Sequence, residues 1–206
     1  MEPRRLFIAI LPDETTRDAL LQSQVLIESN TDKARLTARE NLHLTLAFLG
    51  NQDETHARAV SEAMRQCVAE MAGEPALHLA LGDIGIFDRR KGGCIFWRGV
   101  AGGSDRSALE QLRGRLCRRL RETGFDLPET FKPHFTLARS VRVATVPRGE
   151  KRDRGEEARK IKELCAKIAA QAPDAAFQTT RLSLMWSHRA QPDNVLQYTE
   201  IDSVCW

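Results

Sequence analysis

Two copies of the pattern His-x-Thr-Leu constrain this sequence more than any other feature. The first lies in the apolar run NLHLTLAFLG and the second in KPHFTLAR. Both runs have the composition of β-strands. Because successive side chains of a strand point to opposite faces, His43 shares a face with Thr45, and His134 shares a face with Thr136. The pattern predicts two strands that each present a histidine and a threonine to a polar cleft.

The alternative is a pair of core histidines, each hydrogen-bonded to a neighbouring threonine. For a single histidine this alternative is favoured, since histidine is intermediate in burial. Two copies of one pattern, 91 residues apart (134 minus 43), favour the cleft instead. The other histidines, His56, His78 and His188, lack the threonine partner and are interpreted as surface or core residues.

The rest of the chain alternates between strand and helix patterns. Helical apolar stripes are expected within 12–28, 59–71, 109–120 and 161–168, and strands at 5–11, 77–87, 94–100, 178–187 and 195–201 besides the two histidine strands. Residues 141–157 are polar and predict a mobile loop. Each half of the chain repeats the order histidine strand, helix, two strands. This repetition predicts two similar α+β lobes facing each other across a cleft.

Composition restricts the class of protein. With 42% hydrophobic and 29% charged residues, the chain is typical of a soluble globular protein. No apolar run approaches the roughly 20 residues that span a bilayer. The five cysteines are widely spaced without a Cys-x-x-Cys pair, which argues against a zinc site or a disulfide framework and predicts a cytoplasmic location.

The positive charge is unevenly distributed. A net charge of +3 and a pI near 8.7 permit a phosphate-bearing partner without requiring one. Two basic clusters stand out, and a solvated surface is the favoured interpretation of each. The first is interpreted as a solvated helix face and the second as a solvated loop: Arg113, Arg115, Arg118, Arg119 and Arg121, and Arg148, Lys151, Arg152 and Arg154.

Two histidines in one cleft are suited to moving protons at both ends of a breaking bond. Free imidazole has a pKa of about 6.5, so one ring can be neutral and the other protonated near neutrality. Each threonine hydroxyl can stabilise a phosphoryl oxygen. The spacing of His43 and His134, with no acidic ligand set near either, makes a poor metal site, so no metal or cofactor is expected.

These residues resemble the 2H phosphoesterase superfamily, which is named for two His-x-Thr motifs. The chain is most similar to the RNA 2′,3′-cyclic phosphodiesterase (2′-5′ RNA ligase-like) branch, through RLFIAI, LHLTLAFLG, KPHFTLAR and the late pattern at Leu182–Ser187 and Tyr198. The resemblance implies an α+β fold of two pseudo-symmetric lobes around a central cleft, each an antiparallel sheet with helices packed outside. It also implies a single bilobal domain over 1–206, with one motif in each lobe.

The resemblance further implies roles for individual residues. His43 would be the general acid to the departing ribose oxygen, and His134 would activate water. Thr45, Thr136 and Arg139 would hold the phosphate, and Phe48 would pack on the nucleobase. By strand alternation, Phe48 and Arg139 face away from their histidines. Phe48 and Arg139 therefore reach the cleft only if their strands twist or end near them. The alternatives are that Phe48 is a core aromatic residue and Arg139 a surface arginine.

The resulting hypothesis is an enzyme that hydrolyses 2′,3′-cyclic phosphate ends of RNA or nucleotides to 2′-phosphates. Reversible 2′-5′ ligation of RNA ends is an alternative within the same chemistry. A nucleotide- or RNA-binding module without turnover is an alternative from another class, although binding alone does not need two proton-transfer groups. We expect the protein to be a monomer and to have no membrane partner.

Overall fold

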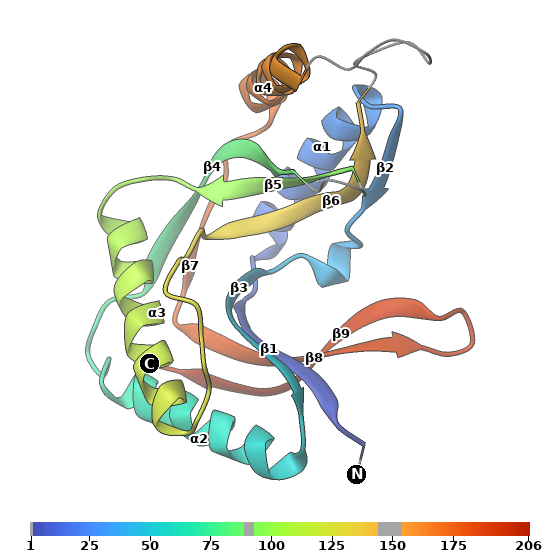
Figure 1. The fold of residues 1–206 in the computed structure, drawn as a ribbon. Coiled ribbons are helices and arrows are strands. Elements are labelled where there is room, and N and C mark those ends of the chain that lie inside the picture. The colour runs from blue at the N-terminus through green and yellow to red at the C-terminus, as the bar shows by residue number, and fades with distance from the viewer. Residues whose placement is uncertain (1, 89–92, 144–153) are drawn as a thin grey trace.

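The computed structural model describes residues 2–88, 93–143 and 154–206 (Figure 1). Its strands are β1 (Arg4–Ile10), β2 (Lys33–Leu36), β3 (Leu44–Gln52), β4 (Leu77–Phe87), β5 (Cys94–Val100), β6 (His134–Arg142), β7 (Ala176–Thr179), β8 (Arg181–Ala190) and β9 (Val195–Cys205). Its helices are α1 (Glu14–Ser29), α2 (Glu54–Ala69), α3 (Ser104–Glu122) and α4 (Arg154–Gln171), with a short 3₁₀ turn, η1 (Arg39–Asn41).

The first two α-helices begin with the same cap. The Asp13 carboxylate accepts a hydrogen bond from the Thr16 amide at 2.8 Å, and the Asp53 carboxylate accepts one from the His56 amide at 2.8 Å. An aspartate at this position satisfies a free amide and places negative charge at the positive end of the helix dipole. These caps end β1 and β3 sharply, so each of the two strands leads directly into a helix.

One antiparallel sheet runs through the molecule in the order β7-β4-β5-β6-β3-β1-β8-β9, with β2 paired to β6. Its middle is narrow, because β3 and β6 are joined by a single residue pair, Leu44 with Phe135. This junction divides the sheet into two lobes. One contains β1, β3, β8 and β9, and the other contains β2, β4, β5, β6 and β7.

Helices cover the outer face of each lobe (Figure 1). Helices α2 and α3 pack together beside β3, while α1 and α4 pack together near β6 and β4. The predicted fold class, α+β with two lobes of antiparallel sheet and outer helices, is confirmed. The lobes are not the two halves of the sequence, however. The chain crosses between them repeatedly, so β1 pairs with β8 from the far end of the chain.

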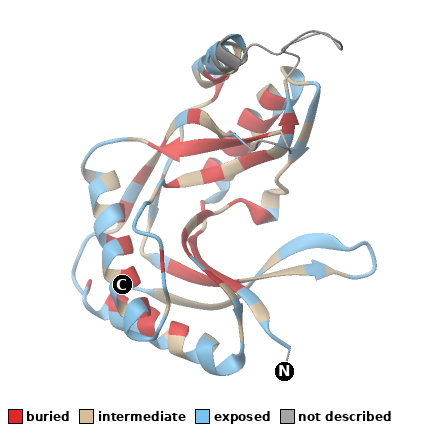
Figure 2. Ribbon diagram, viewed as in Figure 1, coloured by how far each residue is buried: buried red, intermediate tan, exposed pale blue. Residues whose placement is uncertain are grey.

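The core lies between sheet and helices, as the red segments of Figure 2 show. Leu44 and Phe135 at the junction are fully buried, as are Leu6 and Ile8 on β1. Within the described residues, no helix is long and apolar enough to cross a membrane.

Short elements account for most differences from the sequence prediction. Strands β2 and β7 have four residues each; β2 was not predicted, and the end of β7 was predicted as the start of the strand at 178–187. Four residues are too few for a period-2 pattern to be detected in the sequence. The closing strands extend further than predicted, to Ala190 and Cys205. Strand β6 reaches Arg142 and α4 begins at Arg154, and most of the predicted loop between them lies outside the described residues.

Candidate active site

Both histidines lie at the junction between the lobes. His43 directly precedes Leu44, and His134 directly precedes Phe135, the two residues that pair across the junction. Leu44 and Phe135 point into the core, so the residues on either side of them point to the opposite face. Because the strands are antiparallel, each histidine lies beside the threonine of the other motif. Both His-x-Thr pairs therefore meet on one half-buried face.

The two imidazoles are oriented in the same way. Nδ1 of His43 lies 2.7 Å from the Asn41 carbonyl oxygen, and Nδ1 of His134 lies 2.7 Å from the Lys132 carbonyl oxygen. A carbonyl only accepts, so Nδ1 carries the proton in each neutral ring and Nε2 keeps a lone pair. Nε2 of His43 is 3.0 Å from the Thr45 hydroxyl. In both motifs, the carbonyl two residues earlier fixes the ring.

A β-bulge follows each motif at the same position. In β3, Ile8 pairs with Ala47 and Ala9 pairs with Thr45, so Leu46 is an extra residue. In β6, Phe96 pairs with Ala138 and Trp97 pairs with Thr136, so Leu137 is extra. An extra residue reverses the alternation of side chains beyond it. Consistent with this reversal, the consecutive residues in each copy, Leu46–Ala47 and Leu137–Ala138, are both buried.

The bulges correct the expectation that Phe48 and Arg139 face away from the histidines. Beyond each extra residue, both side chains return to the face of the His-x-Thr pair. Phe48 is 50% exposed, which contradicts the alternative of a core aromatic. The Arg139 guanidinium is close enough to both imidazoles to contribute to their lowered pKa values. Phe48 and Arg139 occupy equivalent positions, five residues after His43 and His134.

Each bulge is supported by a buried side chain from a helix. Gln24 of α1 donates to the Leu137 carbonyl at 2.8 Å and to the Thr37 carbonyl at 2.7 Å. Arg113 of α3 donates to the Leu46 carbonyl at 3.4 Å and to the Glu129 carbonyl at 3.1 Å. Both side chains are more than nine-tenths buried. They satisfy carbonyl groups that an irregular strand would otherwise leave without partners.

Aromatic side chains enclose His43 and extend to Phe48. The Phe7 ring lies 4.8 Å from the His43 ring, and the Tyr198 ring meets it edge-on at 5.0 Å. Phe7 also stacks on Phe48 with ring centroids 6.1 Å apart and an interplanar angle of 6°. Arg5 lies over the Phe48 ring at 5.0 Å. A flat, half-exposed platform therefore adjoins His43.

A second aromatic group encloses His134 and carries a cation. Phe87 meets the His134 ring edge-on at 4.9 Å, and Trp97 lies 6.2 Å from it. The Lys132 ammonium lies 4.0 Å from the Trp97 ring centroid and 5.7 Å from that of Phe87. Aromatic faces attract cations at such distances. Lys132 thus provides both the carbonyl that orients His134 and a positive charge beside it.

Burial is the main influence on both histidines. It lowers the pKa of His43 to about 4, with smaller contributions from the charges of Arg139 and His134, against the Asn41 carbonyl, which raises it. Burial also lowers the pKa of His134, with contributions from Arg139 and Lys132, against the Lys132 carbonyl. Removal from water disfavours the charged imidazolium. Both rings are therefore neutral near pH 7 when the site is empty.

Sequence reasoning did not assign a role to Asn41, which links the first motif to β9. Its side-chain amide donates to the Leu196 carbonyl at 2.9 Å and accepts from the Tyr198 amide at 3.1 Å. Its own carbonyl orients His43. Phe7, Phe87, Trp97 and Lys132 were missed as well. Asn41 and Lys132 could have been found from the sequence, because each lies two residues before a motif histidine.

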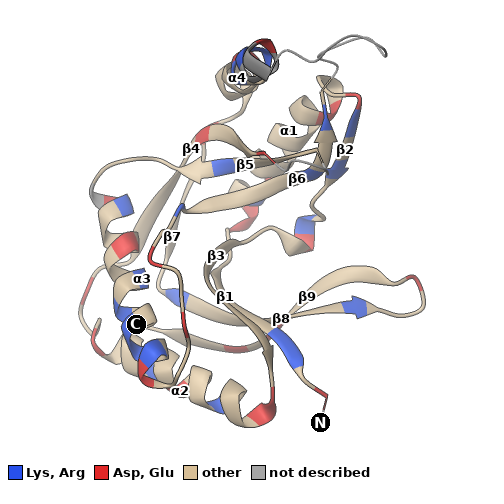
Figure 3. Ribbon diagram, in the orientation of Figure 1, with Lys and Arg blue, Asp and Glu red and all other residues tan. Residues whose placement is uncertain are grey.

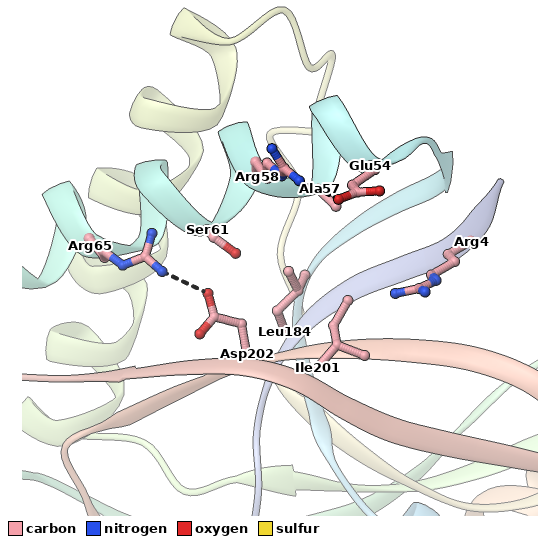
Figure 4. Close-up of a pocket in the computed structure, with 9 residues that line it drawn as sticks. All are labelled: Arg4, Glu54, Ala57, Arg58, Ser61, Arg65, Leu184, Ile201 and Asp202. Carbon is pink, nitrogen blue, oxygen red and sulfur yellow. Dashed lines mark hydrogen bonds and ion pairs between the residues drawn. The ribbon is translucent and has the colours of Figure 1, made fainter. Parts of the chain in front are cut away.

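The remaining histidines and a nearby groove lie outside this site. His56 pairs with Asp53, and His188 stacks on Trp186. A groove of about 310 Å³ lies between α2 and the β8–β9 hairpin (Figure 4), and none of the predicted site residues lines it. Across the part of the chain that the structure describes, no cluster of three or more potential metal ligands occurs.

The arginine cluster of α3 is not a free basic surface. Arg118 and Arg119 pair with Glu70, and Arg115 pairs with Glu74 at 2.6 Å. Arg113 is buried against Leu46. The expectation of a solvated helix face is therefore wrong for Arg113. The second predicted cluster, at 148–154, lies outside the described residues except for the backbone of Arg154.

Comparison with known proteins identifies relatives of the chain. Residues 18–191 match the model of the 2′-5′ RNA ligase superfamily. The RNA 2′,3′-cyclic phosphodiesterase of Thermotoga maritima is 33% identical over 138 residues, which cover 66% of this chain and 69% of the relative. The Escherichia coli protein of the same name is 33% identical over 153 residues, covering 71% and 78%.

Solved structures show the same fold. A crystal structure of E. coli LigT complexed with 3′-AMP aligns over 100% of this chain and 98% of that one, with a TM-score of 0.62 and 23% identity. The protein TT0787 of Thermus thermophilus aligns over 98% and 97%, with a TM-score of 0.66 and 22% identity. These structures share the two-lobed arrangement described above.

Proposed function

Because the chain belongs to the 2′-5′ RNA ligase superfamily, we propose that it hydrolyses 2′,3′-cyclic phosphate ends of RNA to 2′-phosphates. The observation that carries the proposal is the pair of imidazoles at the lobe junction, each held through Nδ1 with Nε2 left for chemistry. The names of the two relatives at 33% identity support the same substrate.

His134 serves as the general base in this proposal. Its lowered pKa keeps the ring neutral at pH 7, and the Lys132 carbonyl holds the proton on Nδ1. The Nε2 lone pair then accepts a proton from the attacking water. The water oxygen bonds to phosphorus as the bond from phosphorus to the ribose 3′ oxygen breaks. Such proton transfer typically contributes about 10²–10⁴-fold.

His43 serves as the general acid and protonates the departing 3′ oxygen. This role requires an imidazolium, whereas the empty site lowers the pKa of His43 to about 4. A cyclic phosphodiester brings a negative charge beside the ring, and a nearby opposite charge favours the protonated form. Substrate binding therefore charges the acid. Thr45, Thr136 and Arg139 hold the phosphoryl oxygens, and Phe48 offers its exposed face to the base.

A product assay tests the proposal. The protein is incubated with an oligoribonucleotide that ends in a 2′,3′-cyclic phosphate, with excess EDTA, and the end group is identified. We expect a 2′-phosphate and no loss of rate on chelation, because the proposed mechanism uses only side chains. A 3′-phosphate product would contradict the assigned leaving oxygen, and a rate restored only by a divalent ion would contradict metal independence.

Two alternatives are separated in the same experiment. Incubating the oligoribonucleotide with a second RNA that has a free 5′-hydroxyl end tests for 2′-5′ ligation. A binding module without turnover would retain the cyclic end. The two oriented histidines favour catalysis, since a binding site for phosphate has no need of a proton donor and a proton acceptor on opposite sides.

A further inference from the structure

Four basic side chains lie together on the paired strands β2 and β6. Arg35 pairs with Arg139, and Lys33 pairs with Arg142. Directly opposite residues of an antiparallel pair point to the same face. We define Lys33, Arg35, Arg139 and Arg142 as the basic ribbon, and Figure 3 shows blue segments on both strands.

Packing of the neighbouring residues fixes the direction of the basic ribbon. Ala34 and Leu36 alternate with the cations of β2 and pack against the hydrophobic core. Val141, next to Arg142, is 1% exposed. The basic side chains therefore point away from the core, and Lys33, Arg35 and Arg142 are exposed.

Like charges that lie directly opposite each other on paired strands destabilise a sheet. The basic ribbon contains two such pairs. No ion pair compensates for them among the described residues. The α3 cluster differs, because Arg115, Arg118 and Arg119 are paired with Glu70 and Glu74. An uncompensated row of cations favours a polyanionic ligand, which would remove the repulsion when it binds.

The basic ribbon is continuous with the active site. Arg139 belongs to both, since its charge acts on His43 and His134 while its strand partner is Arg35. From Arg139 the cations lead outward along the sheet. Lys33 and Arg35 are two residues apart on β2 and so are separated by roughly 6.6 Å, and an irregularity in β6 between Arg139 and Arg142 keeps each opposite its partner. A chain with regularly spaced negative charges, bound at one end by the histidines, matches this arrangement.

We propose that the basic ribbon binds the phosphodiester backbone of an RNA chain whose cyclic end occupies the histidine site. This inference rests on the proposed function and adds a surface that holds the RNA chain beyond its cyclic end. Arg139 contacts the terminal phosphate, while Arg35, Lys33 and Arg142 contact phosphates further along the chain. The contacts go to phosphates and carry no base specificity.

The test compares two substrates and two double variants. The substrates are a 2′,3′-cyclic-ended oligoribonucleotide of about eight residues, within the usual size of single-strand binding sites, and 2′,3′-cyclic AMP. The test variant is Arg35→Gln with Arg142→Gln, which leaves Arg139 intact. The control is Arg58→Gln with Arg106→Gln, which removes the same charge from α2 and α3, where each arginine pairs with a glutamate of its own helix.

We expect the test variant to lose about tenfold in kcat/KM on the oligoribonucleotide, mainly through KM. The slope of log kcat/KM against log salt should become shallower by roughly 1.4, since each single-strand phosphate contact contributes about 0.7. Hydrolysis of 2′,3′-cyclic AMP should change less than twofold. The control variant should match the wild type on both substrates.

Two results would overturn the basic ribbon as an RNA site. One is an equal loss on both substrates, and the other is a loss on the oligoribonucleotide no larger than that of the control. If the wild type hydrolyses neither substrate, the proposed function fails. Binding of a labelled oligoribonucleotide to the same variants then tests separately whether the basic ribbon binds RNA. Equal affinity of the wild type and the test variant would show that it does not.

Discussion

The ring of His43 lies between Phe7 and Tyr198, whereas the ring of His134 lies against Phe87 and Trp97 beside an ammonium group. The two sites share one framework: a carbonyl that holds Nδ1, a threonine two residues on, a bulge, and a side chain five residues on. They differ in what the framework presents. The first site ends in the exposed aromatic Phe48, and the second ends in the cation Arg139.

In the proposed mechanism, this difference lets one local structure take two opposite roles. Arg139 opposes protonation of both rings, whereas Lys132 opposes that of His134 alone, which suits the proposed base that must be neutral before reaction. The aromatic surroundings of His43 remove it from water, so in the proposed mechanism its protonation depends on a charge that arrives with the ligand. A repeated motif thus acquires its asymmetry from the residues around it.

The largest expected effect comes from removing either imidazole. His43→Ala and His134→Ala should each lower kcat/KM by about 10²–10⁴-fold. The double variant should lose much less than the product of the two losses, since groups that act together are not additive. A substrate with a better leaving group should rescue only His43→Ala, because only the acid assists departure.

Rescue of His134→Ala in place of His43→Ala would reverse the two roles. Unchanged rates in both single variants would mean that the rings are structural. Circular dichroism and thermal unfolding of each variant provide the control, because half-buried rings in aromatic surroundings also contribute to packing.

The sequence predicted the His-x-Thr faces correctly because the strand period of two holds from His43 to Thr45 and from His134 to Thr136. It failed at Phe48 and Arg139 because the bulge at Leu46 or Leu137 leaves no local mark. Both copies continue as Thr-Leu-Ala, which reads as regular strand. The buried donors that support the bulges come from helices far away in sequence.

The basic ribbon could not be predicted for a related reason. Lys33 and Arg35 become neighbours of Arg139 and Arg142 only when β2 pairs with β6, more than a hundred residues later. Along the sequence, the dense α3 cluster is the more prominent signal, yet Arg115, Arg118 and Arg119 within it are paired with glutamates. Local density of charge says little about net potential when partners come from another segment.

Phe48 gives the next largest effect on the comparison between the sites. Phe48→Ala should raise KM about tenfold, because stacking of a base on an aromatic ring contributes about 1–3 kcal/mol. Its half-exposed ring contributes little to the core, so thermal unfolding should change slightly. The matched variant Trp97→Ala should act mainly on stability, since Trp97 is 7% exposed. An unchanged KM in Phe48→Ala would exclude the platform as a base site.

Protonation of His43 should respond to an anion in the cleft. NMR titration of the free protein should give a pKa near 4, because burial disfavours the charged ring. Adding inorganic phosphate should raise this pKa by about one unit or more, since an adjacent opposite charge typically shifts a pKa by 1–3 units. A pKa that stays unchanged at saturating phosphate would contradict substrate-assisted charging of the acid.

The folded state should also become less stable as pH falls below 6.5. The pKa of His43 is lower in the folded chain than in the unfolded chain, so the unfolded chain binds the proton first. Its contribution to stability is therefore lost between pH 6.5 and about 4. His43→Gln should flatten this part of the stability profile, measured by denaturant unfolding at several pH values.

The smallest expected effect isolates the cation beside His134. The Lys132 ammonium lowers the pKa of this ring, although burial and Arg139 contribute more. Lys132→Met should therefore raise the pKa of His134 and move the acidic limb of the kcat profile to higher pH, because kcat reports the substrate complex, in which His43 is charged and His134 must be deprotonated. The shift should stay below about one unit, since Lys132 is exposed and its charge is screened by solvent and salt. Lys132→Arg retains the charge and should leave the limb in place. A shift of the alkaline limb instead would show that Lys132 acts on the acid, and the proposed asymmetry between the sites would then be reversed.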